Sequence, residues 1–248
     1  MNQVITETMN HINRLFGPGT IRRGDEYPMQ DRFYTGITSL DAAAGGIPRG
    51  RIVDIFGAES SGKNTLARLI AKSAGEVLYM DAERGLADTS GLTAMYPELL
   101  EDALQAAEVA APAFDAIVID SITALPTKAE AALDIGDFYT KTTAAAVLSR
   151  ALPRLAQALQ KNCCTLVLVN QLRDIPGVVY GRPERPTGGR ALRYYAALRI
   201  ETQRVETIKH GGICTGQRTR VTVRKNKYGA PFRAADMLLA FGSRRATA

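Results

Sequence analysis

The chain lacks tryptophan and has few cysteines, few histidines and no long apolar run. Its three cysteines have neither the spacing of a metal site nor the even number of a disulfide framework. Cys163 and Cys164 precede the apolar run TLVLV, so we expect both to be small, reduced core residues. No run reaches the roughly 18 apolar residues of a membrane span. The N-terminal segment also lacks the apolar core of a secretory signal, and we therefore expect a cytoplasmic protein.

Charge is unevenly spread along the chain. Residues 1–149 hold 12 Lys and Arg against 20 Asp and Glu, whereas residues 150–248 hold 19 against 5. The net charge is therefore −8 in the first part and +14 in the second. Such a basic region indicates a polyanionic partner. A solvated basic face with no dedicated partner remains the alternative.

The central part of the chain alternates apolar runs with helical stretches. Continuous apolar runs at 51–56, 77–83, 116–121 and 165–171 predict strands that are covered on both faces. Helices are predicted at 63–74, at 97–111 with Pro97 in the first turn, and at about 140–161. This order predicts a doubly wound α/β core with a mostly parallel, twisted sheet flanked by helices.

Both ends of the chain depart from this alternation. Residues 5–16 have apolar side chains at helical spacing before FGPG, which predicts an N-terminal helix whose apolar stripe packs on its own core or on a neighbouring subunit. After residue 190 the period becomes two, with GGICTGQ as a turn. The sheet is therefore expected to end in an antiparallel extension.

The sequence GAESSGKNT, residues 57–65, lies between a predicted strand and a predicted helix. Gly57 and Gly62 would let backbone N–H groups curl around phosphate oxygens, and Lys63 would place a charge on them. Asn64 stands where such loops have a hydroxyl that binds magnesium. We expect nucleotide binding by the loop and by the carboxylate that follows the 116–119 run, that is, by Gly57, Glu59, Ser60, Ser61, Gly62, Lys63, Asn64, Thr65 and Asp120.

Polar residues end three of the predicted strands. Asp120 ends AIVIDS, where a carboxylate would meet magnesium or, alternatively, cap a helix with Ser121. Glu83 could orient a water molecule, although Asp81 points to the same face and either residue could be structural. Gln171, with Asn170, ends the 165–171 run and could sense a γ-phosphate.

The segment 171–193 is too long for an ordinary connection and is therefore functional or disordered. Arginines interleaved with Tyr180 suit single-stranded nucleic acid, and Gly188 with Gly189 would let backbone amides approach a phosphate. A merely solvated loop is the alternative.

Several segments together resemble the bacterial RecA recombinases. They run in family order from about residue 11 to 245 and include TGITSLDAAAGGIPRGRIVDIFGAESSGKNT, AIVIDSITALPTKAE, VNQLR, GVVYGRPERPTGGRALRYYAALRIE and TRVTVRKNKYGAPF. The resemblance implies a P-loop ATPase core at 34–245, a subunit-docking helix and strand at 1–33, and a tail at 246–248. It further implies ATP and Mg²⁺ as cofactors, with Asn64 and Asp120 near the metal.

The resemblance also assigns roles to residues. It implies that Lys63 and Glu83 are catalytic, that Gln171 couples ATP to DNA binding, and that Lys225 and Lys227 reach the γ-phosphate of a neighbouring subunit. The two DNA-binding loops correspond to residues 131–143 and 172–187. Residues implied near DNA are Ser149, Arg173, Gly188, Gly189 and Arg190, and the implied relay between subunits is Arg193 with Tyr194.

Four features depart from the family pattern. Asn64 replaces the magnesium-binding hydroxyl, Pro153 interrupts a helix that carries a basic residue there in the family, and Asp174 adds a negative charge beside Arg173. No segment resembles the family's C-terminal domain, which suggests a compact recombinase or an accessory relative. We expect ATP to bind and its hydrolysis to be slowed by one to two orders of magnitude, roughly 1.4 to 3 kcal/mol of barrier.

The leading prediction is an ATP-dependent, DNA-stimulated recombinase of DNA repair and the SOS response. It would form helical filaments on single-stranded DNA and pair that strand with homologous duplex DNA. The alternative is a non-hydrolysing accessory protein that binds DNA or a polymerase. A small-molecule P-loop kinase would explain the loop but neither TGGRALRYY nor the two lysines.

Overall fold

The computed structural model describes residues 3–26, 29–86, 90–134, 144–174 and 184–240, without the side chains of 173–174 and 184–186. The chain divides into two compact units, Met1–Asp31 and Arg32–Ala248. No helix in the described ranges is both long and apolar enough to cross a membrane.

The first unit contains the predicted N-terminal helix. Helix α1 (Gln3–Phe16) leaves every one of its residues at least partly exposed, and a short 3-10 helix, η1 (Gly24–Glu26), follows. The side chain of Asn13 fixes the turn between them. It accepts a hydrogen bond from Ile21 N at 3.1 Å and donates one to Ile21 O at 3.2 Å. Val4, Ile5, Leu15 and Phe16 are exposed while Met9 and Ile12 are half-buried, so within this unit the apolar stripe of α1 is only partly covered.

The second unit is built on one large sheet, as predicted. Its strand order is β11-β10-β9-β3-β7-β6-β4-β5, with β8 paired to β7. Neighbours from β9 to β5 are parallel, and the pairs β9-β10, β10-β11 and β7-β8 are antiparallel. The parallel strands are β3 (Ile52–Gly57), β4 (Val77–Asp81), β5 (Thr93–Met95), β6 (Ala116–Asp120), β7 (Thr165–Asp174) and β9 (Leu198–His210).

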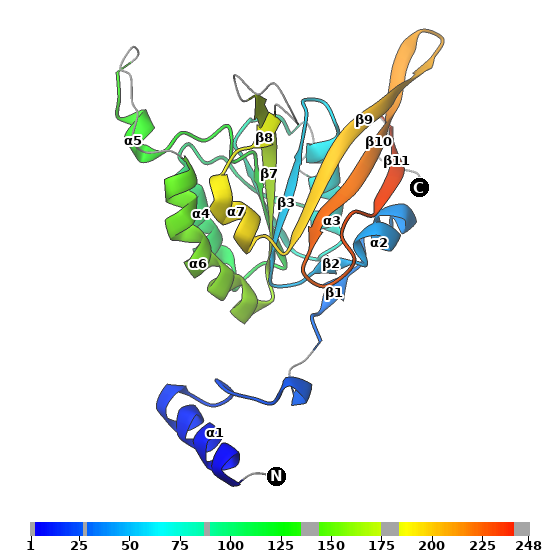
Figure 1. Cartoon of the computed structure of the whole chain (residues 1–248). Helices are drawn as coiled ribbons and strands as arrows, with labels where there is room; N and C mark the ends of the chain where they lie inside the picture. The colour runs from blue at the N-terminus through cyan, green and yellow to red at the C-terminus, as the bar shows by residue number, and fades with distance from the viewer. Residues whose placement is uncertain (1–2, 27–28, 87–89, 135–143, 175–183, 241–248) are drawn as a thin grey trace. The chain divides into compact units, whose positions relative to one another are not determined.

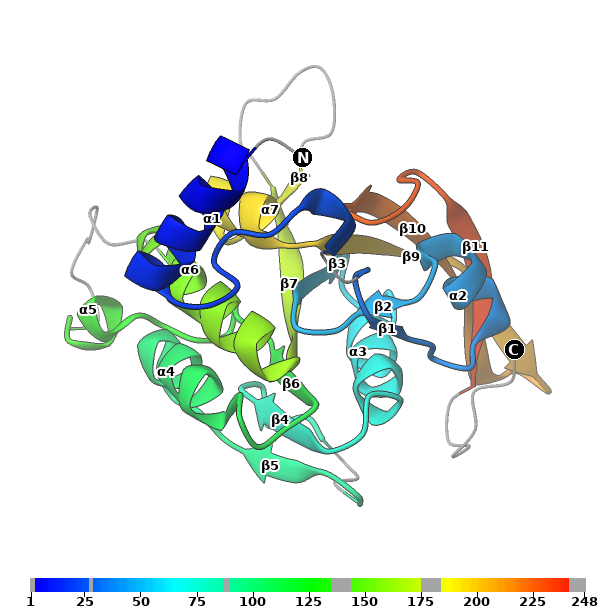
Figure 2. The ribbon, with the colours of Figure 1, turned by 90° about the horizontal axis from the view of Figure 1, so that it is seen from below.

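Helices cover both faces of this sheet (Figures 1 and 2). On one face α2 (Thr38–Ala44) and α3 (Lys63–Lys72) pack over an apolar cluster that includes Val53, Ile55 and Val169. On the other face α4 (Leu100–Ala110), α6 (Ala144–Asn162) and α7 (Gly189–Tyr195) pack over a second cluster that includes Ile52 and Leu168. Alternate residues of one strand thus enter different clusters, because side chains of a strand point to opposite faces.

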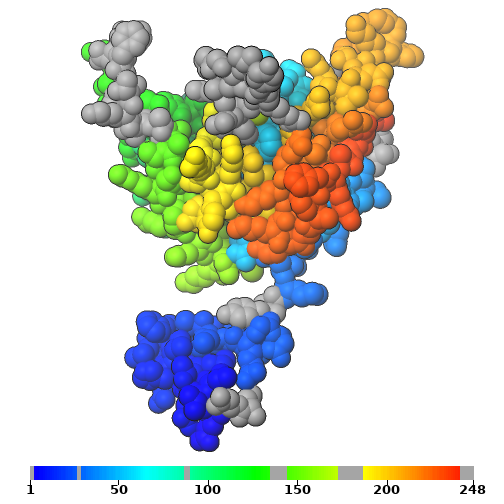
Figure 3. Space-filling model, in the orientation of Figure 1, coloured from blue at the N-terminus to red at the C-terminus, as the bar shows by residue number. Residues whose placement is uncertain are grey.

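The antiparallel extension has the predicted position. Strands β9 and β10 (Ile213–Asn226) form a hairpin whose turn is Gly211 and Gly212, with φ of 57° and 82°. The hairpin stands out beyond the helices of its unit (Figures 1 and 3), and β11 (Ala234–Ala240) completes that edge. The remaining elements are the short pair β1 (Arg32–Phe33) and β2 (Ile47–Pro48), with α5 (Lys128–Ala131) and β8 (Glu184–Pro186).

Three local predictions were wrong. Helix α4 begins at Leu100 rather than near Pro97. The backbone N–H of Leu100 donates to Pro126 O at 3.0 Å, so a tertiary contact holds the first residue of the helix. Helix α6 runs through Pro153, because its apolar stripe packs on the second cluster although the proline removes one helical hydrogen bond. Cys163 is exposed at φ 54°, and only Cys164 belongs to the core, where burial raises the pKa of its thiol to about 12.

Candidate active site

The phosphate loop joins β3 to α3 and requires glycine at both of its ends. A Cβ on Gly57 would lie 2.3 Å from Thr202 O, and one on Gly62, whose φ is 91°, would lie 2.4 Å from Leu239 Cδ1. The loop is held by strand β9, because Ser61 Oγ and Thr202 Oγ1 share a hydrogen bond of 2.7 Å. Its backbone is therefore fixed in the curled form that suits an anion.

Lys63 begins α3 and turns its side chain back across this loop. Its Nζ donates to Ala58 O at 2.7 Å, and the residue is buried. Burial lowers the pKa of Lys63 below its ordinary value, while the carboxylates of Glu83, Asp120 and Glu59 raise it. The ammonium group is thus held at the loop with three carboxylates as its charged neighbours.

Asp120 lies at the end of β6 with one oxygen bound and one free. Oδ2 accepts a short hydrogen bond from the hydroxyl of Tyr79, whereas buried Oδ1 has no partner among the described residues. Burial, with the charges of Glu83 and Asp81, raises the pKa of Asp120 to about 6, against the opposing hydrogen bond from Tyr79. A buried carboxylate oxygen without a partner fits a cation or a water bound to one.

Glu83 connects two other strand ends. Its Oε1 accepts from Ser121 Oγ at 2.6 Å and from Gln171 Nε2 at 3.1 Å. Asp81, the alternative that the sequence left open, accepts from the backbone N–H groups of Gly85 and Leu86 at 3.2 and 3.0 Å. Asp81 therefore holds the turn after β4, while Glu83 faces the loop.

Of these residues, Lys63, Glu83 and Gln171 line one open cavity of about 760 Å³, and Asp120 lies outside its lining. Asn64 and Thr65 both line it and both are exposed, so their side chains are free to meet a ligand. No described group of three or more His, Cys, Asp or Glu residues is arranged to hold a metal without help from a ligand. The lining residues are Glu59, Ser60, Ser61, Gly62, Lys63, Asn64, Thr65, Glu83, Gln171, Leu172, Gln217 and Leu239.

Lys225 of β10 and Lys227, which follows this strand, lie away from this cavity. Lys225 Nζ donates to Arg193 O at 2.6 Å and to Tyr194 O at 2.9 Å, at the C-terminal end of α7. Lys227 Nζ lies 5.6 Å from the centroid of the Tyr194 ring. Within one chain, the structure therefore groups these lysines with the predicted relay pair and not with the phosphate loop.

The residues expected near DNA lie around the beginning of α7, as far as they are described. Gly188 caps α7 at φ 88°, and Gly189 follows at φ 67°. A Cβ on Gly189 would lie 2.9 Å from Ala145 Cβ, so close packing on α6 also requires this glycine. Arg190 is exposed, and Ser149 Oγ donates to Ala145 O at 2.8 Å.

Two of the DNA-binding predictions lie wholly or largely outside the described residues. The side chains of Arg173 and Asp174 are not described, although both residues belong to β7. Residues 135–143 and 175–183, which make up most of the two predicted loops, lie outside the described residues altogether.

Sequence reasoning missed several residues of the site. Tyr79 lies in an apolar run, and only the pairing of β4 with β6 brings it to Asp120. Gln217 and Leu239 reach the cavity from β10 and β11, far along the chain. Asp54 lies outside the cavity, and the sequence marks it as a charged residue inside the buried run RIVDIF.

Comparison with known proteins gives a consistent match along the chain. The family described as the RecA N-terminal domain matches residues 3–244. Protein RecA of Clostridium beijerinckii is 39% identical over 253 residues, which cover 94% of this chain and 70% of that protein. Protein RecA of Nostoc sp. is 38% identical over 258 residues, covering 97% and 72%. The crystal structure of the RadB recombinase has the same fold, with a TM-score of 0.58 at 20% identity over 83% of this chain and 94% of that chain.

Proposed function

The chain belongs to the RecA family, and from that premise we propose that it is an ATP-dependent recombinase that binds single-stranded DNA. The observation that carries this proposal is the cavity at the phosphate loop. Three polar side chains of different segments line it, namely Lys63 from α3, Gln171 from β7 and Glu83 after β4, and Asp120 at the end of β6 is a charged neighbour of Lys63. The ends of parallel strands commonly hold ligands in folds of this type.

The residues present fit ATP with magnesium. Lys63 would neutralise the β and γ phosphates, and the backbone N–H groups of 58–63 would line them. Asp120 Oδ1 and the side-chain oxygen of Asn64 would hold the metal, because both are hard oxygen ligands. Magnesium bound with the nucleotide supplies positive charge beside the transferred phosphoryl group.

Glu83 is the proposed general base of hydrolysis. It lines the cavity, and its Oε1 is oriented by Ser121 and Gln171. Glu83 would take a proton from an attacking water. Protonation of Glu83 would weaken its hydrogen bond from Gln171 Nε2, so Gln171 would respond to the state of the nucleotide. Because Gln171 immediately precedes residues 172–187, the second predicted DNA-binding loop, it would link nucleotide state to DNA binding.

The assembly that we propose is a filament on DNA. Lys225 and Lys227 would act on the γ-phosphate of a neighbouring subunit, and Arg193 with Tyr194 would relay nucleotide state between subunits. The only partly covered apolar stripe of α1 supports the proposal that residues 1–33 dock on a neighbouring core at 34–245. Single-stranded DNA and homologous duplex DNA would contact Ser149, Arg173, Gly188, Gly189 and Arg190.

Asn64 favours a second candidate, a non-hydrolysing accessory protein. An amide oxygen reaches one atom further than a hydroxyl and would place the metal differently. ATP hydrolysis measured with and without single-stranded DNA separates the two candidates. We expect slow, DNA-stimulated turnover by the native chain, a rise of about 10- to 100-fold for Asn64→Thr, and a further loss for Asn64→Ala, which has no oxygen ligand.

Two outcomes decide between the candidates. DNA-stimulated turnover by the native chain excludes the accessory protein. Absence of turnover in both the native chain and Asn64→Thr excludes the recombinase. Binding of single strands should weaken with added salt, because basic residues of the second part of the chain would displace counterions.

A further inference from the structure

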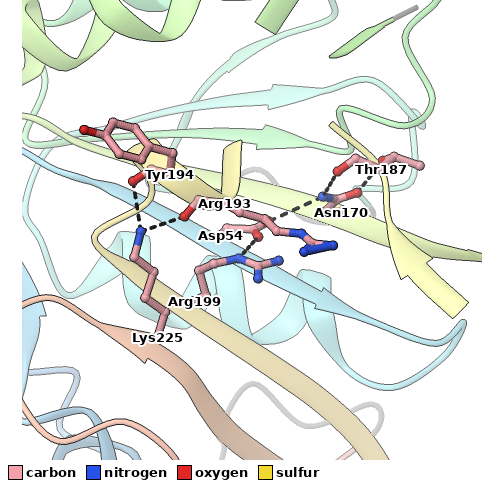
Figure 4. Close-up of polar contacts among 7 residues, drawn as sticks. All are labelled: Asp54, Asn170, Thr187, Arg193, Tyr194, Arg199 and Lys225. Atoms are coloured by element: carbon pink, nitrogen blue, oxygen red, sulfur yellow. Dashed lines mark hydrogen bonds and ion pairs between the residues drawn. The ribbon is translucent and has the colours of Figure 1, made fainter. Parts of the chain in front are cut away.

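A carboxylate that the proposed reaction does not use lies beneath α7. Asp54 is in the middle of β3, three residues before Gly57, and its relative exposure is 0%. It points to the face that α7 covers, and Figure 4 shows it among polar side chains of β7, α7 and β9. Burial of a carboxylate costs free energy unless charged and hydrogen-bonding partners compensate it, so the partners of Asp54 indicate its role.

Arg199 is the main partner of Asp54. The two residues are directly paired across β3 and β9, and Arg199 Nε donates to Asp54 Oδ2 at 2.7 Å. The guanidinium also lies over the ring of Phe56, 4.5 Å from its centroid. Burial raises the pKa of Asp54 while the charges of Arg199 and Arg193 lower it. The carboxylate is thereby bound to β9, and the positive charge of Arg193 on α7 also favours its ionised form.

The second oxygen of Asp54 faces the amide of Asn170. Asn170 Nδ2 lies 3.5 Å from Asp54 Oδ1, which is long for a hydrogen bond, so charge and dipole dominate this contact. Because a carboxylate only accepts, it holds the NH₂ end of the amide on its own side. The amide oxygen is then turned toward Thr187.

Thr187 connects the Asn170 amide to the beginning of α7. Asn170 Nδ2 donates to Thr187 O at 2.9 Å, and Thr187 Oγ1 donates a short hydrogen bond to Asn170 Oδ1. Thr187 N also donates to Gln171 O at 3.4 Å. The bond to Thr187 O needs the amide in this orientation, since a flipped amide would set its oxygen against the carbonyl oxygen, acceptor against acceptor, whereas the Thr187 hydroxyl can either donate or accept. Thr187 immediately precedes Gly188, the cap of α7.

We propose that Asp54 is a positioning residue that, by orienting Asn170 on Thr187, couples the nucleotide cavity to the DNA-binding segment at the beginning of α7. The inference rests on the proposed function, because it assigns a regulator to the same site. Gln171 lines the cavity and is the chain neighbour of Asn170, and its carbonyl is bonded to Thr187. A shift of β7 at Gln171 therefore moves Thr187 and the glycines after it as one piece.

Two variants break this link at different points. Asp54→Asn keeps the shape of the side chain but lets it present either oxygen or NH₂ to Asn170. Thr187→Val keeps the shape of Thr187 and removes its hydroxyl. Thr165→Val is the matched control, because Thr165 Oγ1 makes a buried hydrogen bond of 3.2 Å to Pro48 O at the opposite end of β7.

The measurement is the affinity of a labelled oligothymidylate with and without a poorly hydrolysed ATP analogue. We expect the native chain to bind it at least about fivefold more tightly with the analogue. In Asp54→Asn and in Thr187→Val this ratio falls to near one, while the affinity for the analogue itself changes less than about twofold; Thr165→Val keeps the native ratio. A purely structural role would lower the affinity for the oligothymidylate equally with and without the analogue, and so would leave the ratio unchanged.

The proposed function and the role of Asp54 are overturned by different results. If the native chain shows no dependence on the analogue, the proposed function and the coupling are both overturned. If the native ratio is large and Asp54→Asn keeps it, only the role of Asp54 is overturned. Hydrogen exchange of the α7 amides in the ligand-free protein gives a second measurement. Faster exchange in both variants than in Thr165→Val is expected, and equal exchange in all three contradicts the positioning of α7 by Asp54.

Discussion

Strand β3 presents different chemistry on its two faces. Toward α3 it places Val53 and Ile55, which enter an apolar cluster with Leu66 of that helix. Toward α7 it places Asp54, which is bound to Arg199 and faces Asn170. Beneath α3 the strand thus contributes only apolar packing, whereas on the α7 face it adds to the second apolar cluster a carboxylate whose bonds need one orientation of each partner.

The difference fits what each helix is proposed to do. Helix α3 begins with Lys63 at the phosphate loop, where a fixed frame suits a phosphate. Helix α7 begins beside the proposed DNA contacts, where two defined arrangements are needed for a switch. Apolar burial gives stability, whereas a polar network with matched donors and acceptors allows a discrete change.

The largest expected effect breaks the apolar side. Leu66 is 1% exposed in the cluster beneath α3, so Leu66→Ala should lower the free energy of unfolding by about 2 to 5 kcal/mol through lost burial and a cavity. Val109→Ala on the exposed face of α4, where Val109 is 74% exposed, is the control and should change it by less than about 0.5 kcal/mol. Urea unfolding measures both. A Leu66→Ala loss as small as the control would mean that α3 is not held by packing.

A smaller effect concerns Tyr79, the polar exception on the α3 face. The pKa of Asp120 is raised from 3.8 to about 6, so between these values the folded chain holds more protons than the unfolded chain. Without added magnesium, stability from this group therefore falls as pH rises through that window, by about 3 kcal/mol at most. Tyr79 donates to the ionised carboxylate and opposes the effect.

Replacing this tyrosine should therefore cost more at high pH than at low pH. We expect Tyr79→Phe to lower the free energy of unfolding by about 1 to 3 kcal/mol at pH 8, where Asp120 is ionised, and by less at pH 5, where it is protonated. Tyr96→Phe is the control, because Tyr96 is 48% exposed and follows β5, which is separated from β6 by β4. An equal loss at both pH values would show that Asp120 does not titrate in this range.

The sequence predicted the α3 side of this comparison better than the α7 side. The strands β3, β4, β6 and β7 and the phosphate loop each have a local signal in a continuous apolar run or in glycine spacing. The fold class followed from their order. Local signals failed where tertiary contacts decide, as at Leu100, whose N–H is bonded to Pro126 O, and at Pro153, which the packing of α6 tolerates.

The α7 side depends on partners far apart in the chain. Asp54 and Arg199 are 145 residues apart, and only the placement of β9 beside β3 pairs them. The period-two pattern of β9 predicted a strand but not its neighbour, since an antiparallel extension could have started at either edge of the sheet. The polar network beneath α7 was therefore out of reach of periodicity, although a charge in RIVDIF marked its position.

The smallest effect sharpens the comparison between the two helices, because each has a lysine bonded to backbone carbonyls. Lys63 donates to Ala58 O before α3, and Lys225 donates to Arg193 O and Tyr194 O at the end of α7. Burial, followed by the charges of Lys227 and Arg199, lowers the pKa of Lys225 from 10.5 to about 8. Since the unfolded chain then binds more protons between these values, Lys225 favours folding more as pH rises through them.

The neutral amine is the form that reacts with acylating reagents, so this pKa can be measured without activity. We expect labelling of Lys225, followed by mass spectrometry, to be half-maximal near pH 8 in the folded chain and near pH 10.5 in urea. Lys227→Arg should keep the value because it keeps the neighbouring charge, whereas Lys227→Met should raise it. Half-maximal labelling above about pH 10 in the folded chain would mean that the two carbonyl oxygens, which favour the ammonium form, outweigh burial and the charges of Lys227 and Arg199. Lys63 and Lys225 would then differ in the effect of burial on their pKa values, although both are bonded to carbonyl oxygens.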